Sequence, residues 1–244
     1  MLDASPNRQS RHCLRSALSH LEKAHLLKGV DLAMAAFRAL TAEEEAASAI
    51  MHCLKEHGYR NANLLKPKDH LQKNAISPFF DVLGMSFSQT LGSQFGNPIL
   101  QLEDEGDKRR LMIGLKIGGS DNEQIAFPIP PLNFMATVDG KPLSYRPEIE
   151  RLVEIRGRKD IVTYLREQAN RRNKLLYAGS EGYPSEVELP DNFFENRQVR
   201  VLAMLRAYLL IQPYAEQLTF VQASLDAYLA MLGALKETDL HEFL

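Results

Sequence analysis

Two charged residues interrupt apolar helical stripes and are the first candidates for chemistry in this sequence. Glu44 lies four residues after Leu40 and seven before Met51, so it falls on a stripe that should face the core. Arg172 interrupts a second such stripe. A buried carboxylate is costly unless it is paired, and a guanidinium can hold it through two parallel hydrogen bonds. We therefore predict that Glu44 and Arg172 are buried and in contact.

The residues just before Glu44 allow a second interpretation. Thr41-Ala42-Glu43-Glu44 also fits a capping box, in which a hydroxyl and a carboxylate cap the start of a helix. Glu44 would then lie in an exposed first turn. Both interpretations are open at the level of sequence.

His70 and Lys73 lie three residues apart, on one face of a predicted helix. Together with Glu44 they could form a polar pocket that binds an anion or moves a proton, because an imidazole titrates near neutral pH. The alternative is a surface histidine beside a surface lysine. Arg171, next to Arg172, is a further candidate for the same polar site.

A basic segment precedes and includes these arginines. It contains Arg156, Arg158, Lys159, Arg166, Arg171, Arg172 and Lys174, against Asp160 and Glu167. Such an excess of positive charge could bind the phosphates of RNA, and a dimer would double it. The alternative is a solvated helix face.

Metal and cofactor motifs are missing from the sequence. There is no His-Glu-x-x-His motif, Cys13 and Cys53 do not cluster, and the acidic loop Glu103 to Asp107 lacks the spacing of a calcium loop. No phosphate-binding glycine loop, nucleophile elbow or dinucleotide fingerprint occurs. We expect neither a metal nor a small-molecule cofactor.

Hydrophobic periodicity predicts the helices that would carry these residues. Apolar residues at helical spacing indicate one helix from about Arg11 to Leu27, a second capped by Asp31 and ending near Gly58, and a third opened by Pro67. Pro78 should break or kink the third. Helical spacing returns over 147–177 and 193–235, where Pro213 should divide the last segment.

Between these helices the pattern changes to the two-residue period of strands. Leu111, Ile113, Leu115 and Ile117 alternate with polar or small residues, and Asp139-Gly140 is a turn signal. The predicted fold is mainly α, a bundle of five or six helices with a small antiparallel β insertion. The bundle comprises residues 1–96 and 146–244, and the insertion residues 97–145.

Composition narrows the class of protein. The chain has 244 residues, 45% of them hydrophobic and 25% charged, with a formal net charge of -2, so we expect neither disorder nor a global basic field. Cys13 and Cys53 are predicted to be core thiols, although they could face each other on antiparallel helices. No apolar stretch has the length of a membrane span and the N-terminus lacks a signal peptide, so we expect a cytoplasmic protein that does not bind membranes.

Three separated stretches resemble the HEPN-type helical proteins, most closely their abortive-infection type V branch. They are Ala17–Ala24 followed by Asp31 and Glu43–Ala47; Lys68–Lys73, which contains a His-x-x-Lys pair; and Arg171–Tyr177 followed by Gly182 and Pro184. The resemblance covers about half of the chain, all of it predicted helix, and leaves out the β insertion. It implies an up-and-down helical core that usually dimerises.

In catalytic members the resemblance implies a metal-independent ribonuclease, with four to six residues between an Arg and the His that follows it. This chain departs from that pattern. No His follows Arg171 or Arg172 before His241, and the one Arg-x4-His match, Arg15 to His20, lies on the first helix, where the family does not place it.

The functional expectation is a non-catalytic or degenerate HEPN-like protein that binds protein or RNA, in phage defence or a stress response. One alternative is a metal-independent ribonuclease that uses His70 and Arg172. Another is a structural interaction protein that uses the β insertion. The C-terminal helices, apolar on more than one face between Val199 and Leu235, predict a homodimer.

Overall fold

The computed structural model describes residues 8–90, 98–106, 108–117, 124–134, 137–138, 141–142 and 189–240, and the single residues 163, 167 and 175. Its helices are α1 (Gln9–Leu27), α2 (Leu32–Glu56), α3 (His70–Thr90), α7 (Phe193–Ile211) and α8 (Thr219–Leu240), with a 3-10 turn at Ala62–Leu64. Its strands are β1 (Ile99–Glu105), β2 (Lys108–Ile117), β3 (Gln124–Ala126), β4 (Thr137–Val138) and β5 (Lys141–Pro142). The protein is mainly α with a small antiparallel insertion, as predicted.

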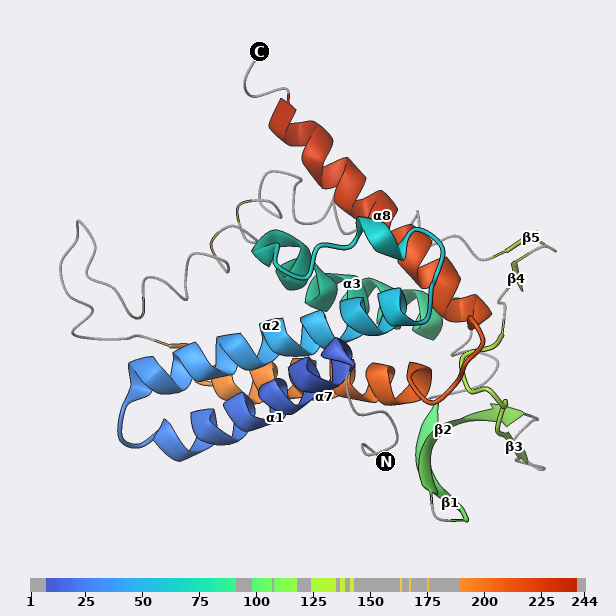
Figure 1. The fold of residues 1–244 in the computed structure, drawn as a ribbon, viewed down its shortest axis with the longest axis horizontal. Helices are drawn as coiled ribbons and strands as arrows, with labels where there is room; N and C mark the ends of the chain where they lie inside the picture. The colour runs from blue at the N-terminus through green and yellow to red at the C-terminus, as the bar shows by residue number, and fades with distance from the viewer. Residues whose placement is uncertain are drawn as a thin grey trace.

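The first two helices form an antiparallel hairpin (Figure 1). Asp31 caps α2, since its carboxylate accepts a hydrogen bond of 2.9 Å from the backbone N–H of Met34. The buried face of α1 carries Leu14, Ala17 and Leu21 at helical spacing. Both helices therefore lie where the periodicity places them.

Helix α2 is the centre of the bundle, because it contacts α1, α3 and α7. Every residue from Ala46 to Leu54 except His52 is buried, and so are Ala42, Glu43 and Glu44. Small side chains on all sides let three helices approach α2 closely. Between residues 41 and 54 only Thr41, Glu45 and His52 are half-buried, so little of this part of α2 faces solvent.

Helix α3 begins at His70, three residues later than predicted. Pro67 does not open it; Asp69 does, because its carboxylate accepts hydrogen bonds from the backbone N–H groups of Leu71 and Gln72. The helix continues through Pro78. The predicted break is therefore absent, although proline removes one backbone donor there.

The C-terminal segment is divided into α7 and α8, with Pro213 in the connection, as predicted. Most of its large apolar side chains are buried within the single chain: Val201, Leu205, Leu210, Leu218, Val221, Leu225, Tyr228 and Leu232. The bundle itself covers much of the apolar surface that suggested a homodimer. In the described part of the chain, no helix combines the length and hydropathy needed to cross a membrane.

The insertion is a three-stranded antiparallel sheet in the order β1-β2-β3, with a separate two-stranded pair, β4-β5. The turn after β1 uses Gly106 in the left-handed region, at φ 60°. Near this turn the register places acidic residues of β1 opposite basic residues of β2: Glu103 opposite Arg110, Asp104 opposite Arg109 and Glu105 opposite Lys108. Opposite charges across the strands favour this register.

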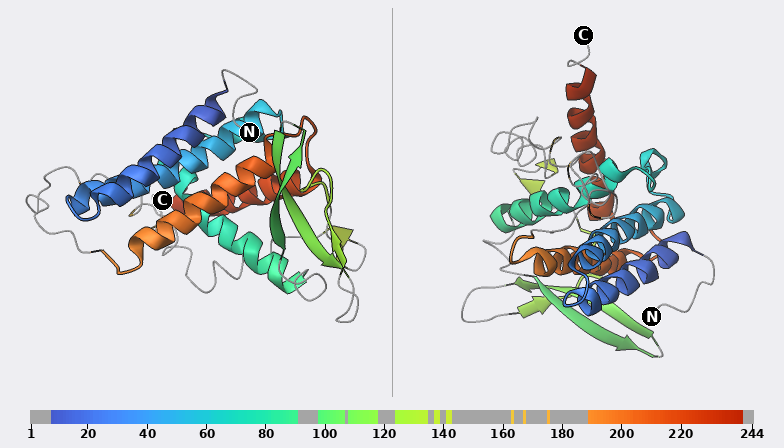
Figure 2. Two further views of the ribbon diagram at one scale, coloured as in Figure 1. Left: turned by 90° about the horizontal axis from the view of Figure 1, so that it is seen from below. Right: turned by 90° about the vertical axis from the view of Figure 1, so that its left-hand side faces the viewer.

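The sheet lies at the C-terminal end of α7, and β2 contacts that helix (Figure 2). Leu111 of β2 belongs to the main core. On the other face of β2, Met112 is buried and accepts a hydrogen bond from the Tyr214 hydroxyl. The insertion is thus docked on the bundle through β2.

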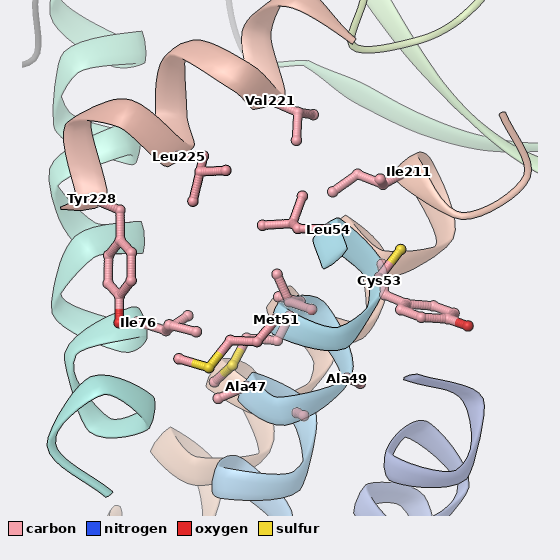
Figure 3. Packing of buried hydrophobic residues seen from close by; sticks show 14 of the residues in the cluster. Ala47, Ala49, Met51, Cys53, Leu54, Ile76, Ile211, Val221, Leu225 and Tyr228 are labelled. Atoms are coloured by element: carbon pink, nitrogen blue, oxygen red, sulfur yellow. The ribbon is translucent and has the colours of Figure 1, made fainter. Parts of the chain in front are cut away.

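One large apolar core fills the space between the helices, and Figure 3 shows part of it. A smaller cluster joins the α1-α2 turn to the start of α7 and includes Leu175. The predicted helix over 147–177 lies outside the described residues except at Thr163, Glu167 and Leu175, which are helical. Cys13 and Cys53 are buried free thiols.

Candidate functional site

The middle of α2 presents two adjacent buried carboxylates, and both face polar side chains of neighbouring helices. Glu44 is 5% exposed, and its Oε2 accepts a hydrogen bond of 3.1 Å from Lys73 Nζ. Its Oε1 lies 2.9 Å from His70 Nδ1. The Lys73 side chain is only 8% exposed, so this ion pair lies inside the protein.

The contact with Glu44 sets the tautomer of His70. A carboxylate only accepts, so Nδ1 must carry the proton that it shares with Glu44 Oε1. This leaves Nε2 of a neutral His70 with a free lone pair. The side chain is 42% exposed, which makes it the most accessible member of the His70-Lys73-Glu44 group.

Glu43 binds residues from two helices. Its Oε1 accepts a hydrogen bond of 2.5 Å from Ser77 Oγ of α3, and its Oε2 accepts one from Arg197 of α7. Arg200 Nη1 lies 3.6 Å from Oε1. Glu43 and Arg197 are both buried, so this is a second internal ion pair.

Helical spacing explains how these groups meet. His70, Lys73 and Ser77 lie three and four residues apart, so they form one polar face of α3 that is turned toward α2. Arg197 and Arg200 lie three residues apart on α7. We call these five residues together with Glu43 and Glu44 the polar cluster. The polar cluster connects α2 to α3 and to α7.

Several hydrogen bonds fix the first turn of α3, which positions His70 and Lys73. Gln72 accepts a hydrogen bond of 2.8 Å from the backbone N–H of Lys66 through its side chain, and one from the Tyr228 hydroxyl through its backbone carbonyl. Ser48 Oγ lies 3.4 Å from the carbonyl of Pro67. The loop before α3 is therefore held against both α2 and α8.

The structure brings together three of the predicted site residues, Glu44, His70 and Lys73. The capping-box interpretation of Glu44 is wrong, because α2 begins at Leu32 and Glu44 lies in its interior. The surface interpretation is wrong for Lys73, which is buried because it neutralises Glu44. The remaining candidates, Arg156, Arg158, Lys159, Arg166, Arg171, Arg172 and Lys174, lie outside the described residues, so the predicted contact of Glu44 with Arg172 stays a prediction.

Glu43, Ser77, Arg197 and Arg200 are not among the site residues predicted from the sequence. For Arg197 a signal exists: it lies four residues after Phe193 and four before Val201, so it interrupts an apolar stripe just as Glu44 does. The apolar stripe that Glu44 interrupts does not predict that Glu43 is buried, since adjacent residues of a helix point in different directions. Both carboxylates lie inside because α3 and α7 cover neighbouring faces of α2, whereas Glu45 beside them is half-buried.

The chemistry open to the polar cluster is limited. All four carboxylate oxygens already accept hydrogen bonds or lie within 3.6 Å of a cation. A proton could be taken up at Nε2 of His70, with Glu44 orienting the ring. Burial raises the pKa of Cys13 to about 11 and that of Cys53 to about 12, so both thiols are neutral and unreactive at pH 7.

The described residues contain no group of three or more His, Cys, Asp or Glu side chains that could hold a metal ion. In the polar cluster the two carboxylates face ammonium and guanidinium groups, which occupy the oxygens that a cation would need. The cluster is therefore arranged for ion pairing.

Comparison of this chain with protein-family models, with curated proteins and with solved structures gave no match. The resemblance to HEPN-type proteins thus rests on the residues of the sequence alone and stays a prediction.

Proposed function

We propose that this protein acts by binding another protein through its β insertion, as a non-catalytic HEPN-like protein. The observation that carries the proposal is the apolar face of β1. Leu100 and Leu102 are 43% and 59% exposed, although both are large aliphatic side chains. They point to the same side of the strand, because they are two residues apart.

This exposed pair continues a face that is buried elsewhere. Leu102 pairs with Leu111 and Leu100 pairs with Ile113, and paired residues of an antiparallel sheet lie on the same face. Leu111 is in the core and Ile113 packs against it. The apolar face therefore extends past the bundle onto β1, where a partner could cover it.

The free edge of β1 favours one kind of partner. Among the described residues β1 pairs with β2 alone, so its outer edge can accept another strand. The acidic residues near the end of β1 do not call for a basic partner, because Asp104 is already paired with Arg109 of β2 at 2.7 Å and Glu103 lies opposite Arg110. A partner strand with alternating aliphatic residues would match this edge and the apolar face of Leu100 and Leu102.

The polar cluster supports a function without catalysis. Its carboxylates are engaged in holding α2 to α3 and α7, and the buried thiols are neutral at pH 7. Removal of one partner of such a buried ion pair strongly destabilises the folded state. This arrangement suits a rigid scaffold that displays the insertion.

The test uses the double variant Leu100→Glu with Leu102→Glu in the full chain. A photo-crosslinking amino acid at position 102 first identifies the bound protein in cells, and the affinity of the purified partner is then measured by calorimetry. We expect the double variant to weaken binding at least 10-fold while the circular dichroism and thermal midpoint stay those of the wild type. The matched control is Leu26→Glu, since Leu26 is 72% exposed on α1 and distant in sequence.

Two results would contradict the proposal. One is equal affinity of the double variant and of Leu26→Glu for the purified partner. The other is that the protein is isolated from cells with bound RNA and no bound protein, and that this RNA is lost when Arg171 and Arg172 are both replaced by Ala. That result would assign binding to the basic segment.

One observation favours a second candidate, the metal-independent ribonuclease. The hydrogen bond from His70 to buried Glu44 is the geometry in which a carboxylate orients a general base. Cleavage of single-stranded RNA in the presence of a chelator, lost in His70→Ala and kept in His12→Ala, would support this candidate. His12 is an exposed histidine of α1 and serves as the control.

A further inference from the structure

An apolar cavity of about 100 Å³, partly open to the outside, lies where α2, α3, α7 and α8 meet. Met51 and Leu54 of α2, Ile76 of α3, Ile211 of α7 and Leu225 of α8 are among the residues that line it. Figure 3 shows these side chains pointing toward one another from different helices. The cavity thus belongs to the centre of the bundle.

The polar atoms in the lining are already satisfied. The Ser224 hydroxyl donates to the carbonyl of Phe220 at 2.8 Å, and the Tyr228 hydroxyl donates to the carbonyl of Gln72. No charged side chain is among the lining residues. A polar ligand would therefore lose its hydrogen bonds to water without replacement, whereas an apolar ligand would not.

Water is a poor occupant of such a space. An ordered water needs two to four polar partners, which this lining does not offer, and enclosed cavities of about 150 Å³ with a similar lining bind benzene or xenon. A cavity of about 100 Å³ is smaller, so it suits a xenon atom or a short alkyl group.

The β insertion supplies part of the wall. Leu132 lines the cavity, and its carbonyl accepts a hydrogen bond of 3.2 Å from the backbone N–H of Phe220 at the start of α8. Asn133 accepts one of 2.9 Å from the Thr219 hydroxyl. The rings of Phe134 and Phe220 stack with their centroids 4.9 Å apart. Residues 132–134 are thus attached to α8 beside the cavity.

We propose that this cavity binds a small apolar molecule or the alkyl end of a larger one, and that residues 132–134 respond to its occupancy. This inference does not depend on the protein-binding function proposed above. The ligand displaces no ordered hydrogen bond, and its contacts are with carbon and sulfur atoms of the four helices and of Leu65 and Leu132. Leu132 carries the effect of binding to the insertion.

The test follows the methyl signal of Met51 by NMR in the full chain labelled at methionine methyl groups, with Met51→Leu as the assignment variant. Met51 is 1% exposed and lines the cavity. The probes are xenon, which represents a free apolar molecule, and octanoate, which represents an alkyl chain with a polar end. We expect a saturable shift of the Met51 signal with at least one of them.

The filling variant is Ala207→Leu, since Ala207 lines the cavity. It should abolish the shift, and the control Ala203→Leu, on the same helix but outside the lining, should keep it. Ser224→Leu fills the same cavity if the first variant does not fold. The proposal is overturned if neither probe moves the Met51 signal, or if the shift persists in a folded filling variant. A response to octanoate and not to xenon identifies the alkyl end as the ligand.

Discussion

Glu43 and Glu44 lie inside the bundle because donors from neighbouring helices bind each carboxylate. The donors to Glu44 lie on α3, and those to Glu43 lie on α3 and α7. Glu44 binds Lys73 and His70, and Glu43 binds Ser77 and Arg197. A buried charge without such partners would cost several kcal/mol. At the scale of the residue, the polar cluster is therefore first a condition for folding, and its members with substantial access to solvent are His70 and Arg200.

The two cysteines give a direct prediction at this scale. With pKa values of about 11 and about 12, Cys13 and Cys53 are almost entirely protonated at pH 8. We expect no reaction with a disulfide reagent such as DTNB in the native protein at pH 8, and reaction of both thiols in concentrated urea. Release of one thiol equivalent within seconds from the native protein would show that a cysteine is exposed and activated.

Part of the polar cluster could be predicted from the sequence. Glu44 interrupts one apolar stripe, and its burial follows from that pattern. The proximity of His70 and Lys73 on one helical face also follows from their spacing. The contacts of Glu43 with Ser77 and Arg197 could not be predicted, since they depend on how three helices distant in sequence cross.

At the scale of the elements, local chemistry explains both the successes and the errors. Alternating residues placed β2 and the first half of β1 correctly, because one sheet face must be buried. The acidic segment that begins at Glu103 was wrongly expected to be a loop, since Glu103 to Glu105 continue β1 and pair with β2. The start of α3 was predicted at Pro67, but the hydrogen bonds that the Asp69 carboxylate accepts from the backbone N–H groups of Leu71 and Gln72 place it at His70. Pro78 is tolerated inside α3, where packing of both halves against the core outweighs one lost hydrogen bond.

Two glycines allow a paired prediction on these elements. A Cβ at Gly114 of β2 would lie 2.8 Å from side-chain atoms of both Ile125 and Phe127, whereas one at Gly233 of α8 meets nothing within 4 Å. We expect Gly114→Ala to lower the free energy of unfolding by about 1 to 3 kcal/mol through overpacking. Gly233→Ala should raise it by about 0.5 to 1 kcal/mol, because alanine favours the helix.

Urea denaturation of both variants checks the pair. If Gly114→Ala is as stable as the wild type, then β3 and Phe127 do not pack over β2 as described. Gly233→Ala is the control for the general effect of replacing glycine by alanine.

At the scale of the whole molecule, three histidines make stability depend on pH. Burial lowers the pKa of His20, His52 and His57, and the neighbouring Arg38 and Arg8 lower the pKa of His20 and His57 further. The folded state then binds fewer protons than the unfolded state as pH falls below about 6.5, so the free energy of unfolding falls with it.

We therefore expect a lower urea midpoint at pH 5.5 than at pH 7.5, and a smaller difference in the triple variant His20→Gln, His52→Gln, His57→Gln. Equal pH dependence in the triple variant and the wild type would mean that other groups set the slope.

The homodimer remains a prediction about the whole molecule. Most apolar residues of α7 and α8 are covered within one chain, which leaves half-buried side chains such as Leu202, Leu209 and Leu229 for an interface. Sedimentation equilibrium at micromolar concentration should give twice the chain mass of 27.6 kDa. A mass of one chain would show that the bundle buries both faces of these helices itself.

We infer that the polar cluster holds the bundle together. The most direct measurement is the free energy of unfolding of Glu44→Ala against the matched variant Glu22→Ala, whose glutamate is exposed on α1. We predict a loss of about 3 to 5 kcal/mol for Glu44→Ala, because Lys73 is left buried without its carboxylate. Glu22→Ala should change stability by less than about 0.5 kcal/mol. A Glu44→Ala protein as stable as the wild type, or more stable, would contradict the claim and would instead fit a cluster kept for chemistry at the cost of stability.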